Sequence, residues 1–172
     1  TLDATAADSL RPLLDERPDV LLLAVPEAAL PALREAAHAE APAARVATLR
    51  APVSGAAGGL VFACDWHGEL SRYGAAQLNE RFARRSGAAM DERAWSGWLA
   101  VKLASEAQLR GGPEDRIARI AAARTDGHAG APLRFRRDDR HLDTAVHVVG
   151  PPRDATRGPA RILATLAPGE EA

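Results

Sequence analysis

The chain has 172 residues, of which 47% are hydrophobic and 26% charged, a composition typical of a folded globular domain. Its formal net charge of -1 at pH 7 gives no basic footprint for nucleic acid or an anionic membrane surface. No apolar run reaches the roughly 18 residues that a membrane-spanning helix needs. The single cysteine, Cys64, lies in an apolar run, which favours a small buried side chain over a nucleophile or metal ligand.

The first third of the chain has the alternation of βαβ units. After a short helix near the N-terminus, the continuous apolar run 20–25 is typical of a strand covered on both faces. A helix is expected from Pro26 until just before Pro42, and 45–49 is expected as the next strand. This alternation predicts a parallel sheet and therefore an α/β fold.

A small-residue loop, RAPVSGAAGG at 50–59, follows the second strand. It contains neither the P-loop motif nor the dinucleotide-binding glycine motif, and it precedes a strand where a phosphate-binding loop precedes a helix. Nucleotide binding is therefore disfavoured. The loop nevertheless lies at the carboxyl edge of the predicted sheet, where open α/β folds bind ligands, so it is a candidate ligand-binding segment.

The central part of the chain predicts a buried strand followed by two helices. An apolar run at 60–64 is followed by the polar break Asp65-Trp66-His67-Gly68. The first helix is expected to end at Ser86-Gly87, and the second to begin after Asp91 and end at Gly111. The apolar stripes of these two helices are Leu70, Tyr73, Leu78 and Phe82 in the first, and Ala94, Trp95, Trp98, Leu99, Val101, Leu103 and Leu109 in the second.

The last third of the chain predicts a short helix over 113–123 and a break at 125–127. The alternating stretch 133–136 and the apolar stretch 145–149 are expected to pair as a hairpin across a polar turn. Residues 153–172, rich in proline, glycine and charge, are expected to form a loosely held tail.

Histidine and aspartate residues, which often act in catalysis, are present but do not occur in known catalytic motifs. His67 adjoins Trp66 and Asp65, yet no second histidine or cysteine follows at metal-ligand spacing. Asp138 and Asp139 are flanked by arginines, which favours a solvated ion cluster over acid–base catalysis. No nucleophile elbow or zinc-protease motif occurs, so we predict no catalytic residue, no metal and no cofactor.

Four motifs in succession resemble those of one protein family. They are G-L-V-x-x-x-x-W-H from Gly59, R-Y-G-A-x-Q-L-N-x-R-F from Arg72, M-x-x-x-A-W-x-x-W-x-A-V-K from Met90, and D-G-H-x-G from Asp126 with L-R-F-R from Leu133. The sequence resembles the C-terminal half of type I periplasmic solute-binding proteins of branched-chain amino acid ABC transporters. More narrowly, it is similar to the subfamily associated with pyrroloquinoline-quinone-dependent alcohol oxidation.

The resemblance implies the C-terminal portion of the type I fold, with parts of both lobes, in a periplasmic protein that delivers a small ligand to an ABC permease. No nucleic-acid partner and no direct membrane insertion are expected, and the export signal is expected outside this sequence. Hinge positions would be Cys64, Asp65, Asp126 and Gly127, with Trp66 or His67 facing the cleft. The implied division is 1–62 in the second lobe, 63–67 as a crossing, 68–123 in the first lobe, 124–130 as another crossing, 131–152 as a hairpin returning to the second lobe, and 153–172 as a tail.

One departure from the family bears on the ligand. Amino acid binders of this family hold the ligand's ammonium group with an acidic residue on the loop after the second strand, where this sequence has Arg50 and Ser54 but no carboxylate. An unpaired cation in a dry cleft is costly, so an anionic or polar solute is favoured over an amino acid. The alternative from another class is a stand-alone α/β interaction or regulatory domain. A hydrolase or dehydrogenase fragment lacks the required nucleophile or glycine motif.

Overall fold

The chain folds into two compact units. The computed structural model describes residues 8, 10–49, 59–112, 115–130, 132–152 and 160–168. Unit 1 is Thr1–Ala63 with Val148–Leu163, and unit 2 is Cys64–His147 with Ala164–Ala172. The chain therefore passes between the units three times, after Ala63, after His147 and after Leu163.

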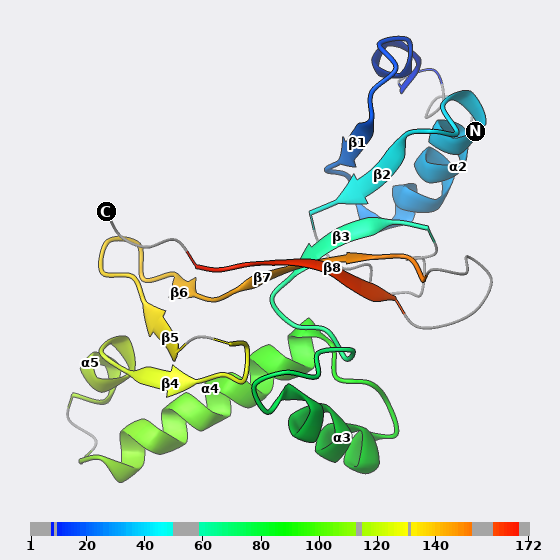
Figure 1. Cartoon of the computed structure of the whole chain (residues 1–172). Helices are drawn as coiled ribbons and strands as arrows, with labels where there is room; N and C mark the ends of the chain where they lie inside the picture. Colours follow the sequence, from blue (N-terminus) through cyan, green and yellow to red (C-terminus); the bar gives the residue numbers. More distant parts are fainter. Residues whose placement is uncertain are drawn as a thin grey trace. The chain divides into compact units, whose positions relative to one another are not determined.

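The helix and strands of unit 1 follow the βαβ order expected from the sequence (Figure 1). They are β1 (Val20–Leu23), the short 3-10 helix η1 (Glu27–Ala29), α2 (Leu30–Glu40) and β2 (Arg45–Thr48). β1 pairs with β2 and β2 pairs with β3 (Val61–Cys64), both in parallel. The full strand order of this sheet is β1-β2-β3-β7-β8, in which β7 is Val146–Gly150 and β8 is Arg161–Leu166. The prediction of an α/β fold with a parallel sheet is confirmed.

One face of the sheet in unit 1 is covered by the apolar side of α2. The buried residues of this core are Leu10, Leu14, Leu21, Leu23, Leu30, Leu33, Ala37, Val46 and Leu60. On the other face of β1, Val20 and Leu22 are 55% and 56% exposed. The prediction that the run 20–25 is covered on both faces is therefore wrong, because among the described residues only one face of this end strand receives a packed helix.

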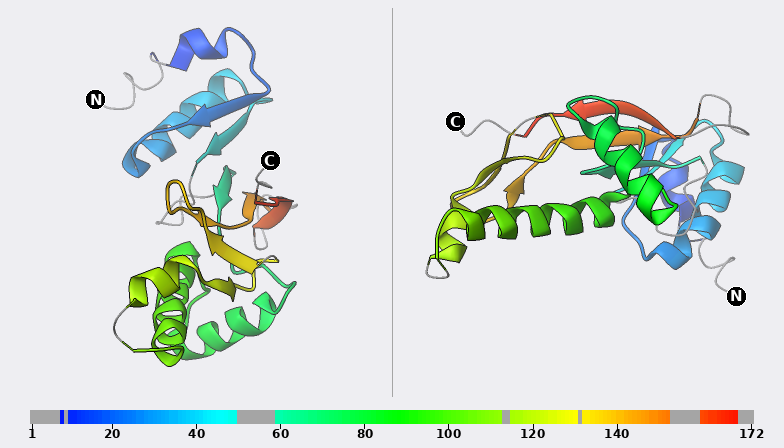
Figure 2. Two further views of the ribbon diagram at one scale, coloured as in Figure 1. Left: turned by 90° about the vertical axis from the view of Figure 1, so that its left-hand side faces the viewer. Right: turned by 90° about the horizontal axis from the view of Figure 1, so that it is seen from below.

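Unit 2 contains three helices and a small antiparallel sheet. The helices are α3 (Ala75–Ser86), α4 (Glu92–Leu109) and α5 (Arg116–Ala121), and the sheet has the order β4 (Arg124–Asp126), β5 (Pro132–Phe135), β6 (Leu142–Asp143). Figure 2 shows α4 as the longest helix, with the short α5 beside its C-terminal end. The Arg119 Nε atom of α5 donates to the Ala107 carbonyl of α4 at 3.0 Å, which holds the two helices together.

Local sequence rules fix three of the four ends of α3 and α4. Gly87 ends α3 in the left-handed conformation with φ 73°, and Asp91 caps α4 by accepting from the Ala94 N–H at 2.8 Å. α4 ends at Leu109, just before Gly111. The start of α3 differs from the prediction: Leu70 lies in the preceding loop, and Tyr73 has φ 56° and is 64% exposed, so neither belongs to the helix.

The strands near the C-terminus pair differently from the prediction. β5 pairs with β4 and β6, so the predicted hairpin of 133–136 with 145–149 is wrong. The polar turn at 137–139 returns the chain directly onto β5, which leaves β7 for the larger sheet. Residues 124–130, expected as an interlobe crossing, lie inside unit 2 in β4 and the turn after it. The expected tail contributes β8 as a strand of the larger sheet.

Candidate functional site

The segment after β3 is held in place by a stacked pair of tryptophans. Trp66 and Trp95 are each 1% exposed, and their rings lie 5.4 Å apart with an interplanar angle of 9°. The Trp66 Nε1–H donates to Asn79 Oδ1 at 2.9 Å, and the Trp95 Nε1–H donates to the Gly127 carbonyl at 3.0 Å. The indole of Trp66 therefore has one ring face and its only donor engaged within unit 2.

Asn79 of α3 fixes the loop that follows Trp66. Its Nδ2 donates to the carbonyls of Gly68 at 2.9 Å and Leu70 at 3.1 Å, while its Oδ1 accepts from Trp66. One side chain thus ties a buried indole and two loop carbonyls to a helix. The spacing of residues in the sequence does not reveal which loop groups Asn79 reaches.

His67 follows Trp66 and is half-buried. Its Nδ1 accepts from the Glu69 backbone N–H at 3.2 Å, so the neutral ring carries its proton on Nε2. Burial lowers the pKa of His67, although the nearby charge of Glu69 opposes this change. Burial therefore favours the neutral form of the imidazole.

His147 is a second histidine in the same region, and the sequence did not predict its burial. Its side chain is 2% exposed, and its Nδ1 lies 3.0 Å from Thr165 Oγ1. Its Nε2 has no hydrogen-bond partner among the described residues. Burial lowers the pKa of His147, and the charge of the neighbouring His67 lowers it further.

These groups lie where the chain passes between the units. His67 comes soon after the passage at Ala63, His147 ends the unit 2 segment before the second passage, and Thr165 comes just after the third. Inside unit 2, His147 therefore joins the two chain segments of the unit through Thr165, and it lies near enough to His67 for the charge of one imidazole to affect the other. This cluster, His67, His147 and Thr165, is the candidate site.

The predicted hinge residues have different surroundings. Cys64 is 3% exposed, and burial raises the pKa of its thiol to about 12, so it is not a nucleophile. Asp65 is half-buried beside it. Asp126 accepts from the His128 N–H at 2.7 Å, and Gly127 lies where an added Cβ would come within 2.2 Å of Leu133 Cδ1. Asp126 and Gly127 therefore form a tightly packed turn of unit 2.

Two of the four predicted ligand-binding residues, Arg50 and Ser54, lie outside the described residues. They follow the carboxyl end of β2 in the sequence. The predicted ion cluster at the β5–β6 turn is present with a different partner, since Asp139 pairs with Arg136 and not with Arg137 or Arg140.

Among the residues that the structure describes, no group of three or more His, Cys, Asp or Glu side chains is placed to hold a metal ion. Within the same residues, no helix combines the length and hydropathy needed to cross a membrane.

Comparison with known proteins gives a result at the level of structure. No family model matches the sequence, and no curated protein matches it. Solved structures do match. The leucine-, isoleucine-, valine-, threonine- and alanine-binding protein of Brucella ovis, in its closed conformation, has a TM-score of 0.78 at 15% identity, covering 94% of this chain and 46% of its own. A leucine-binding protein from Thermotoga maritima has a TM-score of 0.74 at 16% identity, covering 94% and 48%.

A third match is the solute-binding protein of an ABC transporter from Rhodopseudomonas palustris in complex with p-hydroxybenzoic acid. Its TM-score is 0.69 at 14% identity, covering 99% of this chain and 50% of its own. The chain has the fold of one half of such binding proteins. It spans about half the length of the structures it matches.

Proposed function

We propose that the chain is part of the solute-binding component of an ABC transporter. It would capture a small polar or organic-acid solute between two lobes and present it to a membrane permease, without chemical conversion of the solute. The observation that carries this proposal is the structural match over 94% or more of the chain to one half of known binding proteins. The division into two units joined by three passages of the chain supports a mechanism of closure around a ligand.

The polar groups of the candidate site favour an anionic or carbonyl-bearing solute. His67 would contribute as a neutral imidazole, because its Nδ1 accepts from the Glu69 backbone and burial disfavours a second proton. Arg50 and Ser54 follow β2 in the sequence. The Arg50 guanidinium would form charge-assisted hydrogen bonds to the solute, and the Ser54 hydroxyl would donate another. A carboxylate matches these three groups, whereas an ammonium group finds no counter-charge among them. Trp66 stacks on Trp95 and donates a hydrogen bond to Asn79, and these two contacts would fix the position of the adjacent residue His67.

The matched structures widen the choice of solutes to test. Their ligands, by name, include branched-chain amino acids and p-hydroxybenzoic acid. The link to alcohol oxidation and a periplasmic location rest on the sequence resemblance alone, so alcohols and aldehydes belong in the same panel. The permease partner likewise follows from the family that the chain resembles.

The test is a thermal-shift screen of the full-length protein against amino acids, benzoates, short carboxylates, alcohols and aldehydes. A ligand that binds only the folded state raises the melting temperature, and at one hundred times its Kd the stabilisation is about 2.7 kcal/mol. Carboxylates are expected to give the largest shifts. A full-length protein that responds to no solute in the panel contradicts the proposal and favours the interaction-domain alternative.

The residue assignments are tested separately by titration calorimetry with the best solute. Arg50→Ala and His67→Ala are each expected to weaken binding of a carboxylate by about tenfold or more, since each removes a hydrogen bond to a charged group. Arg45→Ala is the matched control for Arg50, because Arg45 is an exposed arginine at the first position of β2, five residues earlier in the sequence. Equal affinity of Arg50→Ala and Arg45→Ala refutes the role of Arg50 while leaving the proposed function standing.

A further inference from the structure

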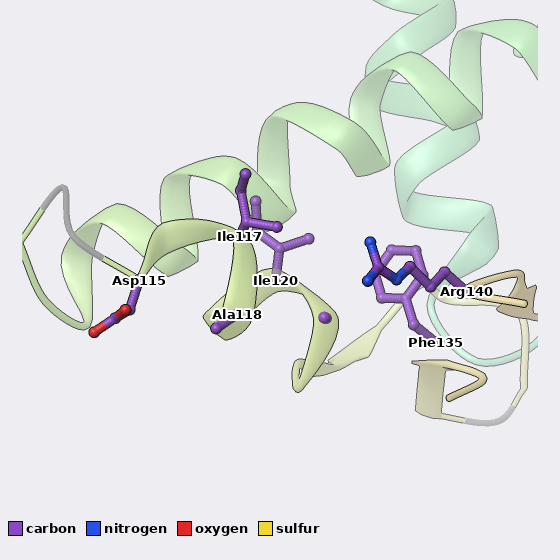
Figure 3. Close-up of a pocket in the computed structure, with 7 residues that line it drawn as sticks. Asp115, Ile117, Ala118, Ile120, Phe135 and Arg140 are labelled. Atoms are coloured by element: carbon purple, nitrogen blue, oxygen red, sulfur yellow. The ribbon is translucent and has the colours of Figure 1, made fainter. Parts of the chain in front are cut away.

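Unit 2 has an apolar hollow that the proposed function does not use. It has a volume of about 570 Å³ and lies between α5 and the segment that carries β5 and the following turn (Figure 3). Its lining residues are Asp115, Ile117, Ala118, Ile120, Ala121, Phe135 and Arg140. None of the residues of the candidate site or of the predicted hinge lines it.

The apolar part of the hollow is left open to water. Ile117 is 79% exposed, while Ile120 and Phe135 are half-buried and face the same space. An occupant with an apolar body would remove this surface from water, which is the main source of binding free energy at such sites. The volume falls within the range of about 300–1,000 Å³ that is usual for small-molecule sites.

Two charged side chains line the hollow, Arg140 at one end and Asp115 at the other, and Arg140 has no ion pair among the described residues. Figure 3 shows the Arg140 guanidinium beside Phe135 and directed toward Ile120. No hydrogen bond or ion pair of the Arg140 side chain occurs within the described part of the chain, and the nearby Asp139 pairs with Arg136 at 2.5 Å. Asp115 lies at the far end of α5, with its carboxylate directed away from Arg140. The charge at the Phe135 end of the hollow is therefore positive.

We propose that this hollow is a second small-molecule site, which binds a carboxylate with an apolar body. The carboxylate pairs with the Arg140 guanidinium, whose planar N–H fork matches two carboxylate oxygens, and the apolar body lies across Ile117, Ile120 and Phe135. A neutral alcohol of the same length forms only the apolar contacts, and an alkylammonium is repelled by Arg140. The site thus selects by charge at one end and by shape along α5.

The test uses octanoate, 1-octanol and octylamine with the full-length protein, so that chain length is constant and only the head group changes. Binding is measured by titration calorimetry, and its location by chemical-shift changes at Ile117, Ile120 and Phe135. Octanoate is expected to bind saturably and at least tenfold more tightly than octylamine. Arg140→Gln is expected to weaken octanoate binding about tenfold and to leave binding of 1-octanol unchanged.

Arg137→Gln is the matched control, because Arg137 is exposed in the same turn, has no ion pair among the described residues, and does not line the hollow. It is expected to change octanoate affinity less than twofold. Ala121→Phe places a large ring in the hollow and is expected to abolish binding of both octanoate and 1-octanol. The proposal would be overturned by any of three results: octanoate does not bind saturably, the two arginine variants weaken octanoate binding equally, or the chemical-shift changes are confined to other residues. These outcomes are independent of whether the full-length protein captures a solute between its lobes.

Discussion

Replacement of Asn79 by alanine is expected to destabilise unit 2 by about 3 kcal/mol. The Trp66 Nε1–H is buried and would lose its acceptor at 2.9 Å, which costs about 1–3 kcal/mol. The carbonyls of Gly68 and Leu70 would lose donors at 2.9 and 3.1 Å, each worth about 1 kcal/mol and partly recovered by water. The combined loss is large compared with the usual effect of an exposed polar residue.

Urea unfolding followed by tryptophan fluorescence measures this effect in the right part of the molecule. The three tryptophans, Trp66, Trp95 and Trp98, all lie in unit 2, so the signal reports on that unit. Glu80→Ala is the control, since Glu80 is the next residue of α3 and makes an exposed ion pair with Arg84 worth less than about 0.5 kcal/mol.

A double-mutant cycle separates the Asn79–Trp66 bond from the other contacts. Trp66→Phe removes the donor, so the combination with Asn79→Ala is expected to be less destabilising than the sum of the single changes by about 1 kcal/mol. A loss below about 1 kcal/mol for Asn79→Ala, or a coupling energy near zero, would refute the argument that Asn79 satisfies the buried indole.

Three further predictions follow from packing and ionisation. Gly127→Ala is expected to lower the free energy of unfolding by about 1–3 kcal/mol, because the added Cβ meets Leu133 Cδ1 at 2.2 Å. Gly97→Ala, on the exposed side of α4, meets nothing within 4 Å and is expected to raise the free energy of unfolding by about 0.5–1 kcal/mol. Similar urea midpoints for the two variants contradict this prediction. The pKa values of His67 and His147 are lowered in the folded state, so the unfolded chain binds protons at a higher pH than the folded chain does. The free energy of unfolding is therefore expected to fall as the pH drops below about 6.5, and to fall less steeply in His147→Gln. Urea unfolding of both proteins at pH values from 7.5 to 5 tests the direction of the change and the effect of the substitution. Burial raises the pKa of Cys64 to about 12, so iodoacetamide at pH 8 is expected to modify Cys64 only after unfolding in urea, and rapid labelling of the native protein would disprove the burial.

The sequence predicted those features that depend on neighbouring residues. The cap at Asp91 and the left-handed end at Gly87 follow from rules that operate within one helical turn, and both are present. The parallel pairing of β1 and β2 follows from the helix α2 that lies between them in the sequence. These features need no knowledge of residues distant in the chain.

Features that depend on distant partners were not predictable. Trp66 followed a strand and was expected at a cleft, but its burial depends on Trp95 and Asn79, which come from two different helices. His147 was placed on a solvated hairpin, because the sequence does not reveal that β7 joins the larger sheet and that Thr165 returns beside it. Arg140 was assigned to an ion cluster, and its place at an apolar hollow depends on α5, which precedes it by two strands.

The interleaved order of the two units has a consequence for biosynthesis. β1, β2 and β3 leave the ribosome before α3, α4 and α5, yet their sheet is completed only by β7 and β8, which are translated after those helices. Until then the free edge of β3 exposes unpaired backbone groups, a condition that favours aggregation of nascent chains. A single cleavage of the backbone cannot separate the two units, because the chain passes between them three times. A ribosome stalled between α3 and β6 holds a chain in which the larger sheet is still incomplete. The yield of folded protein is therefore expected to depend on translation speed and on chaperones that shield this edge.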